Sequence, residues 1–206
     1  MPEFAGVFDV HVTVAAEGDD VERLARWAAG NDAKLTHIVL ARGEVPSQPM
    51  VTLAGRGTLT DQRVAADACV ARLRGEGFAV ARVKIEAAPW NEDVPRSASE
   101  AVELAGCYFE HHVKVVARDD VAALAEVGGR HAAHVSRNAR RRRDDGTHER
   151  FVTQRCRGVG LAEAGRRLDA LVAELRSRGF AVQETEREFV VHDDNPAIDA
   201  GWIEER

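Results

Sequence analysis

Two histidines in this sequence are each followed, two residues later, by a hydroxyl side chain. The two tripeptides are His11-Val12-Thr13 and His134-Val135-Ser136. On a β-strand, the side chains of residues i and i+2 point to the same face, so each imidazole would lie beside a hydroxyl. An imidazole gives or takes a proton near neutral pH, and a hydroxyl can hold an anionic oxygen. The pattern therefore indicates histidine acid–base chemistry on an oxygen-rich substrate.

These tripeptides resemble the signature of the two-histidine phosphoesterases, a family of two pseudosymmetric lobes that handles cyclic phosphates and RNA ends. The resemblance implies that His11 and His134 are the general acid and base, and that Thr13 and Ser136 hold phosphate oxygens. It also implies hydrolysis or transfer on an anionic small molecule or an RNA end. The sequence departs from that family because His11 lies closer to the N-terminus than the family's first motif.

An internal repeat organises the rest of the chain. The stretch from Phe8 to about Asp93 recurs from Phe109 to about Asp194. The clearest matches are FDVHVTV with FEHHVKV, which pairs His11 with His112, and GFAV at 77–80 with GFAV at 179–182. The segment LTHIV at 35–39 aligns with AAHVS at 132–136, which pairs His37 with His134. A duplication predicts two similar units with a site between them, and it works against a motif that joins His11 to His134.

The elements within each repeat are predicted from hydrophobic periodicity. Alternation of apolar and polar residues at 8–14 indicates a half-buried strand. Further strands are expected at 35–41, 50–56 and 78–87, and helices at 19–30 and 60–74. The second repeat follows the same order, with helices at 119–128 and 161–178. This succession is typical of a ferredoxin-like unit, in which strands one and three are central and both helices cover one face.

The sequence thus predicts an α+β protein of two tandem, duplicated ferredoxin-like (βαββαβ) units whose open sheet faces pack toward each other. The expected division is a first repeat at 1–94, a linker at 95–107, a second repeat at 108–194 and a tail at 195–206. Polar residues of the inward-facing strands would then line a pocket between the repeats.

The repeat symmetry suggests a second kind of chemistry. His11 with Glu86 and His112 with Glu188 would form two equivalent pairs, and two imidazoles with two carboxylates can hold one divalent metal ion. This is similar in logic to the vicinal oxygen chelate enzymes, where paired repeats each supply ligands, although the order of elements differs. His112 is for the same reason a candidate catalytic residue. A third hypothesis is a non-catalytic ligand-binding or interaction module, because a fold alone does not imply activity.

Several basic residues could bind an anionic substrate. Arg56 and Arg157 each precede a glycine at equivalent places, and Lys114 would lie on an open sheet face. A run of arginines that includes Arg137 and Arg140 and extends to Arg143 precedes the turn signal Asp144-Asp145-Gly146. Guanidinium groups suit phosphate oxygens, so this run is either a basic flap over the ligand or a solvated hairpin tip.

Composition narrows the classes of protein. The chain has 206 residues and a formal net charge of −6, which argues against general affinity for nucleic acid or anionic membranes. No apolar run approaches the roughly 18 residues that a membrane helix needs. Three cysteines without metal-ligand spacing are consistent with a cytoplasmic location. No P-loop, dinucleotide-binding, serine-elbow or zinc CxxC pattern is present, and the oligomeric state stays open.

Overall fold

The chain follows the predicted order of strands and helices in the computed structural model, which describes residues 2–117, 121–142 and 147–203. The first repeat consists of β1 (Gly6–Ala15), α1 (Asp19–Ala29), β2 (Lys34–Leu40), β3 (Ser47–Gly57), α2 (Leu59–Gly75) and β4 (Ala79–Ala87). The second consists of β5 (Tyr108–Ala117), α4 (Val121–Arg130), β6 (Ala133–Arg142), β7 (His148–Cys156), α5 (Leu161–Ser177) and β8 (Ala181–Asp193). A short helix, α3 (Ala98–Val102), lies between the repeats, and a 3-10 helix, η1 (Pro196–Asp199), follows β8.

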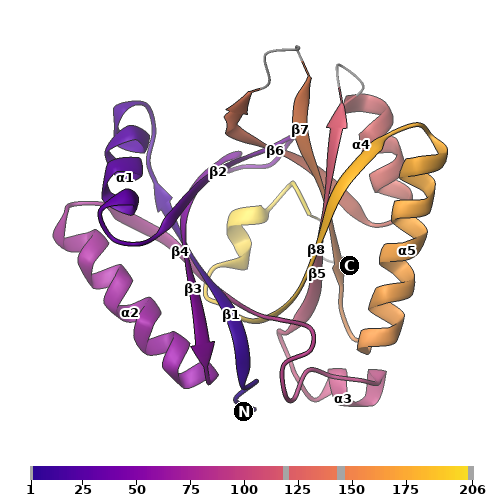
Figure 1. Ribbon diagram of the computed structural model, residues 1–206, viewed down its shortest axis with the longest axis horizontal. Helices are drawn as coiled ribbons and strands as arrows, with labels where there is room; N and C mark the ends of the chain where they lie inside the picture. Colours follow the sequence, from indigo (N-terminus) through magenta and orange to yellow (C-terminus); the bar gives the residue numbers. More distant parts are fainter. Residues whose placement is uncertain (1, 118–120, 143–146, 204–206) are drawn as a thin grey trace.

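Each repeat forms an antiparallel sheet with the predicted strand order. The first sheet runs β4-β1-β3-β2 and the second runs β8-β5-β7-β6, so the first and third strands of each repeat are central. Helices α1 and α2 cover the outer face of the first sheet, and α4 and α5 cover that of the second (Figure 1). The prediction of two tandem ferredoxin-like units is confirmed.

The two sheets join at both edges into one closed barrel. Strand β2 pairs with β6 through Ile38, Val39 and Leu40, and β4 pairs with β8 from Lys84 to Ala87. The open faces therefore face each other as predicted, but across an interior space and not in direct contact. Figure 1 looks down this barrel, with all four long helices on the outside.

Strand alternation decides which side chains enter the barrel. In β1, Phe8, Val10 and Val12 are buried in a core beneath α1 and α2. Successive side chains of a strand point to opposite faces, so Asp9 and His11 point inward. In β5, Val113 and Val115 belong in the same way to a second core, under α4 and α5.

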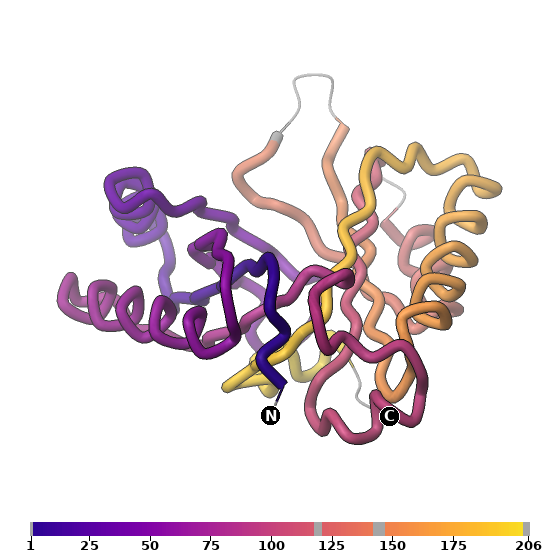
Figure 2. Tube along the Cα trace, turned by 60° about the horizontal axis from the view of Figure 1, so that its bottom comes forward, coloured from indigo at the N-terminus to yellow at the C-terminus, as the bar shows by residue number. Residues whose placement is uncertain are grey.

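The segment after β8 folds back against the barrel interior. Helix η1 appears within the outline of the barrel in Figure 1, and its Asp199 pairs with Arg82 of β4 and Arg155 of β7. The indole of Trp202 donates a hydrogen bond to the carbonyl oxygen of Val135 at 3.0 Å. This segment covers part of the interior and fixes strands from both repeats. Figure 2 shows β6 and β7 extending away from the rest of the barrel.

Candidate functional site

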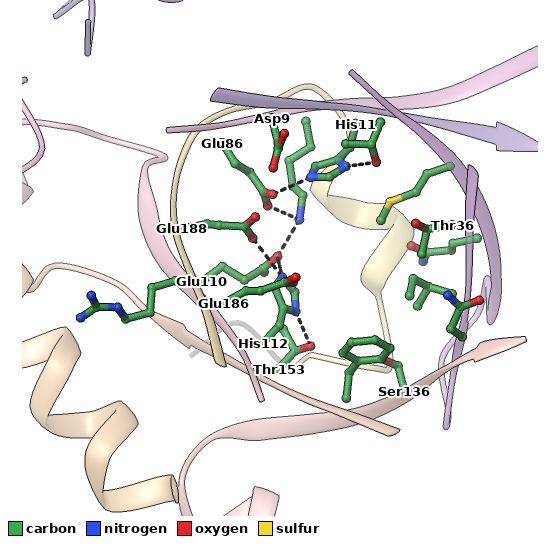
Figure 3. Close-up of a pocket in the computed structure, with 18 of the residues that line it drawn as sticks. Asp9, His11, Thr36, Glu86, Glu110, His112, Ser136, Thr153, Glu186 and Glu188 are labelled. Carbon is green, nitrogen blue, oxygen red and sulfur yellow. Dashed lines mark hydrogen bonds and ion pairs between the residues drawn. The ribbon is translucent and has the colours of Figure 1, made fainter. Parts of the chain in front are cut away.

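A cavity of about 520 Å³ occupies the interior of the barrel, and side chains of both repeats line it. We call it the chamber. Asp9, His11 and Thr13 of β1 reach it, as do Glu110, His112 and Lys114 at the equivalent places of β5. Figure 3 shows most of these side chains converging from opposite strands. The polar residues that alternation places on the inward-facing side of β1 and β5 therefore line the chamber, together with residues of the other strands.

His11 is held on both ring nitrogens. Its Nδ1 lies 2.8 Å from the Thr52 hydroxyl, and its Nε2 lies 2.7 Å from Glu86 Oε2 (Figure 3). The side chains of His11 and Glu86 are 11% and 2% exposed. The ring is therefore fixed, with Nε2 directed at a buried carboxylate.

His112 repeats this arrangement in the second half. Its Nδ1 lies 3.0 Å from the Thr153 hydroxyl, and its Nε2 lies 3.3 Å from Glu188 and 3.4 Å from Glu110. Register in the sheets makes His11 equivalent to His112, because they pair with the equivalent threonines of β3 and β7. The two imidazoles thus present the same nitrogen to the same space from opposite sheets.

A chain of charges connects the two histidine sites. The Lys84 ammonium lies 2.6 Å from Glu86 Oε1 and 2.6 Å from Glu110 Oε1. The second oxygen of Glu110 pairs with the Arg155 guanidinium. Glu110 is 1% exposed and both of its oxygens have cationic partners, so it is the most firmly tied carboxylate of the cluster.

The environment of the histidines favours their protonated forms. Burial lowers the pKa of His11, but the negative charge of Glu86 outweighs it and the pKa is raised overall. Burial likewise opposes the charged form of His112, and its bonds to Glu110 and Glu188 raise its pKa to about 10. The protonated form of His112 therefore dominates at neutral pH, and the surroundings of His11 shift it in the same direction.

The carboxylates divide into two kinds. Burial would raise the pKa of Glu86, but the charges of Lys84 and His11 hold it well below its ordinary value. For Glu188 the balance is the reverse, since burial together with the charge of Glu86 raises its pKa to about 7 despite the bond to His112. Glu188 thus gains or loses a proton near neutral pH.

Two groups of side chains have the spacing to hold a metal ion. In the first, ligand atoms of His11, Glu86 and Glu188 all lie within 4.8 Å of one another, and in the second those of Glu86, Glu110 and His112 do. Glu86 belongs to both groups. Its Oε1 is buried and forms an ion pair with the Lys84 ammonium.

The predicted partner of His11, His134, lies elsewhere. Its ring packs beside Trp202, with ring centroids 5.9 Å apart, and it is not among the residues that line the chamber. Ser136 does line the chamber and is buried. The structure therefore does not support a catalytic pair of His11 and His134, although Thr13 and Ser136 both reach the chamber.

The internal alignment of β2 with β6 needs a correction of three residues. Thr52 pairs with Lys34, and the equivalent Thr153 pairs with His134, so His134 corresponds to Lys34 and not to His37. A shift by an odd number of residues reverses the face of every side chain in a strand. His37 accordingly bonds Ser47 at 2.9 Å and does not line the chamber.

The candidate anion-binding residues are dispersed. Arg56 and Arg157 are exposed and do not line the chamber, and Arg157 lies over the ring of Tyr108. Lys114 lines the chamber but pairs with Glu184. These duplicated arginines therefore form no common site with the histidines.

The arginine run is only partly described. Arg137 lines a separate cavity of about 200 Å³, and Arg140 pairs with Glu22 of α1. Arg143 and the predicted turn at 144–146 lie outside the described residues. The prediction was a basic flap over the ligand. Arg141 lines the chamber and therefore has the position that this prediction requires.

Several charged residues of the chamber were missed from the sequence. Three of them, Arg82, Arg155 and Asp199, form a buried network, with distances of 3.0 Å and 2.7 Å from the two guanidinium groups to Asp199. Alternation along β4 and β7 could have placed both arginines inward. Nothing in the tail sequence indicated that Asp199 returns to the barrel.

Comparisons with known proteins bear on the fold alone. No protein-family model matches this sequence, and no curated protein matches it. The chain is similar to the solved structure of the acetolactate synthase small subunit from Thermotoga maritima, at 13% identity and a TM-score of 0.29, over 89% of this chain and 94% of that one. It is also similar to a putative chlorite dismutase, at 14% identity and a TM-score of 0.29, over 90% and 94% of the two chains. For chlorite dismutase from Candidatus Nitrospira defluvii in complex with imidazole, the identity is 13%, the TM-score 0.28 and the coverage 90% and 91%.

At TM-scores this low, these similarities carry no argument about ligand or activity. The assignment of the fold rests on the strand order and register described above. Among the described helices, none is both long and apolar enough to cross a membrane.

Proposed function

We propose that the chamber binds one divalent metal ion through His11, Glu86, His112 and Glu188 and uses it to act on a small molecule. The observation that carries this proposal is the matched pair of imidazoles, each with Nδ1 at a threonine hydroxyl and Nε2 directed at a carboxylate. Histidines that bind metals are commonly oriented by a hydrogen bond from the other ring nitrogen.

The choice of Glu188 over Glu110 follows from their partners. Glu110 is already bonded by Lys84 and Arg155 through separate oxygens, so binding a metal would break an ion pair. Glu188 has an unusually high pKa and contacts His112, and a bound cation would remove the cost of its buried charge. Glu86 belongs to both groups of side chains that have the spacing to hold a metal ion.

Charge also favours a divalent ion. The surroundings of both imidazoles raise their pKa and so favour the charged form of each ring. A divalent cation that replaces one proton on each imidazole leaves the total charge of the chamber unchanged. Ligand histidines must be neutral, so binding is expected to release protons.

A metal at this point would face the chamber, where a substrate oxygen or a water molecule could complete its coordination. Polarisation of a carbonyl and activation of water are the reactions that such a site supports. If the site binds a small molecule without converting it, the protein is a metal-dependent binding module. A measurement of turnover distinguishes this module from an enzyme.

Metal content tests the proposal directly. The metal-free protein is titrated with Zn²⁺, Mn²⁺ and Co²⁺ by calorimetry, and elemental analysis after dialysis gives the stoichiometry. We expect one ion per chain for the wild type. His11→Gln and Glu188→Gln should lower affinity by more than the roughly 10- to 100-fold that loss of an outer partner costs.

The matched control is His37→Gln, since His37 lies outside the chamber and should leave affinity unchanged. Visible absorption of the Co²⁺ form gives a second readout of the ligand set. Absence of stoichiometric binding by all three ions in the wild type rejects the proposal, as does equal affinity in His11→Gln and His37→Gln.

A further inference from the structure

The wall of the chamber has two chemically different sides. Strands β1, β4, β5 and β8 present the histidines and charged residues of the metal site. Strands β2, β3, β6 and β7 present mainly apolar and uncharged groups, among them Thr36, Ile38, Leu40, Met50, Ser136, Asn138 and Phe151. They also carry the charged Lys34, Arg141, Glu149 and Arg155. Figure 3 shows Thr36 and Ser136 across the chamber from Glu86 and Glu188.

Three apolar side chains on the second side stand outside both hydrophobic cores. Ile38, Met50 and Phe151 line the chamber, are only partly buried and belong to neither of the two hydrophobic cores. Apolar groups that face an internal cavity gain free energy when an apolar ligand displaces the water beside them. They therefore form a surface suited to the body of a ligand.

We propose that the ligand of the chamber is an amphipathic small molecule, with an uncharged apolar body and one oxygen-bearing end. The body lies against Ile38, Met50 and Phe151, and the oxygen end points to the metal site. This inference rests on the proposed function for the polar end of the ligand, but the apolar surface is an independent observation.

The size of the chamber agrees with this class of ligand. A cavity of about 520 Å³ holds a small molecule, since ligand pockets typically measure roughly 300–1,000 Å³. A few polar groups among apolar ones are the usual means of fixing orientation. Thr36, Ser136 and Asn138 supply such groups on the apolar side.

The proposal also distinguishes this ligand from a phosphate-bearing one. The buried cations that line the chamber, Arg82, Lys84 and Arg155, each pair with carboxylates. A phosphate group bound to these three cations would have to displace those carboxylates, which are buried themselves. A neutral body with a single oxygen-bearing end needs no such exchange.

A pair of hydroxamates tests the inference, because the metal-binding end is constant and only the body differs. Binding of acetohydroxamate and benzohydroxamate to the Zn²⁺-loaded protein is measured by calorimetry, with phenyl phosphate as a third probe. We expect benzohydroxamate to bind roughly 10-fold or more tightly than acetohydroxamate, since its ring buries apolar area. Phenyl phosphate should bind more weakly than benzohydroxamate.

Variants of the apolar side test whether Ile38 and Met50 cause the preference for benzohydroxamate over acetohydroxamate. Ile38→Asn and Met50→Gln should reduce the ratio of the two affinities toward one while metal content and acetohydroxamate binding stay unchanged. The matched control is Val64→Asn, at an exposed position of α2, which should leave the ratio as in the wild type.

The outcomes separate the two proposals. The preference for benzohydroxamate is also measured in the metal-free protein, where the apolar side is intact. A preference that persists without any uptake of metal rejects the metal site and keeps the amphipathic ligand. Equal affinity of the two hydroxamates in both forms, a ratio unaffected by Ile38→Asn and Met50→Gln, or tighter binding of phenyl phosphate overturns the inference.

Discussion

The Lys84 ammonium lies 2.6 Å from Glu86 of its own strand and 2.6 Å from Glu110 of the other repeat. A single positive charge thus joins the carboxylates of both sheets at the centre of the barrel. The position equivalent to Lys84 in the second repeat is Glu186, because His11 pairs with Lys84 and His112 with Glu186. The bridge therefore exists once, and the metal site beside it is only approximately symmetric.

Removal of this ammonium should destabilise the protein strongly. Lys84→Met leaves two buried carboxylates without their shared cation, and breaking a buried pair in this way costs about 3–5 kcal/mol. The free energy of unfolding is measured by urea denaturation. Lys114→Met is the control, because its partner Glu184 is half exposed and such pairs contribute about 0–1 kcal/mol. Equal losses in the two variants would contradict the role of Lys84 as a bridge.

Stability of the metal-free protein should fall as pH rises from 5 to 10. The folded-state pKa of His112 is about 10, above its ordinary 6.5, so its contribution is complete below pH 6.5 and is lost as pH approaches 10. The folded-state pKa of Glu188 is about 7, above its ordinary 4.5, so its protonated form adds stability below 4.5 that is lost between 4.5 and 7. Urea denaturation at intervals of pH measures the slope.

The variant His112→Gln isolates the alkaline part of this dependence. It should be flatter than the wild type between pH 7 and 10, because the group that loses its proton is gone. Parallel curves for the two proteins would show that His112 does not titrate as its surroundings imply.

Affinity for a divalent ion should show the opposite trend and increase with pH. The ion competes with the protons on His11 and His112, and both pKa values are raised. Calorimetry in two buffers of different ionisation enthalpy counts the protons released at pH 7, and we expect between one and two. Affinity that does not vary between pH 6 and 8 would place the ion away from these imidazoles.

The threonines behind the histidines should affect metal affinity more than stability. Thr52→Val and Thr153→Val remove the hydroxyls at Nδ1 of His11 and His112, and loss of such an orienting partner costs roughly 10- to 100-fold in affinity. Thr36→Val is a matched control that lines the chamber from β2. If all three variants bind metal equally, the orientation of the imidazoles does not depend on these hydroxyls.

Asp199 should contribute strongly to stability, because it holds the segment after β8 against the barrel interior. Asp199→Asn removes the charge that Arg82 and Arg155 share, and the expected loss is about 3–5 kcal/mol of unfolding free energy. Glu44→Gln, at an exposed position, is the control. A loss below 1 kcal/mol for Asp199→Asn would show that the two guanidinium groups are satisfied by other partners.

Local patterns accounted for much of the fold and for the inward-facing residues. The alternation around His11 and His112 is regular. Because the neighbouring hydrophobic residues must face the core, each strand can adopt only one register. Alignment of the repeats failed at His134. Both segments contain a histidine, and matching His134 with His37 gave a register that is wrong by three residues. Residues near His134 alternate weakly, so a single histidine outweighed the pattern.

The closure of the barrel and the charge network could not be read from local patterns. Pairing of β2 with β6 and of β4 with β8 involves only short stretches of these strands, which periodicity does not specify. Asp199 contacts partners 44 and 117 residues away, and ion pairs over such separations leave no periodic signal. The cavity between the repeats was predicted, but its two-sided character depends on this closure.

The substitution of Lys84 by Glu186 between repeats has a consequence for how such a site can arise. A barrel assembled from two identical single-repeat chains would carry every inward-facing residue twice, and two lysines at the position of Lys84 would repel each other across the centre. Joined in one chain, the copies are free to differ, so Arg155 can stand where the other half has Ala54. Covalent fusion thereby allows the two halves to carry different charges at equivalent positions.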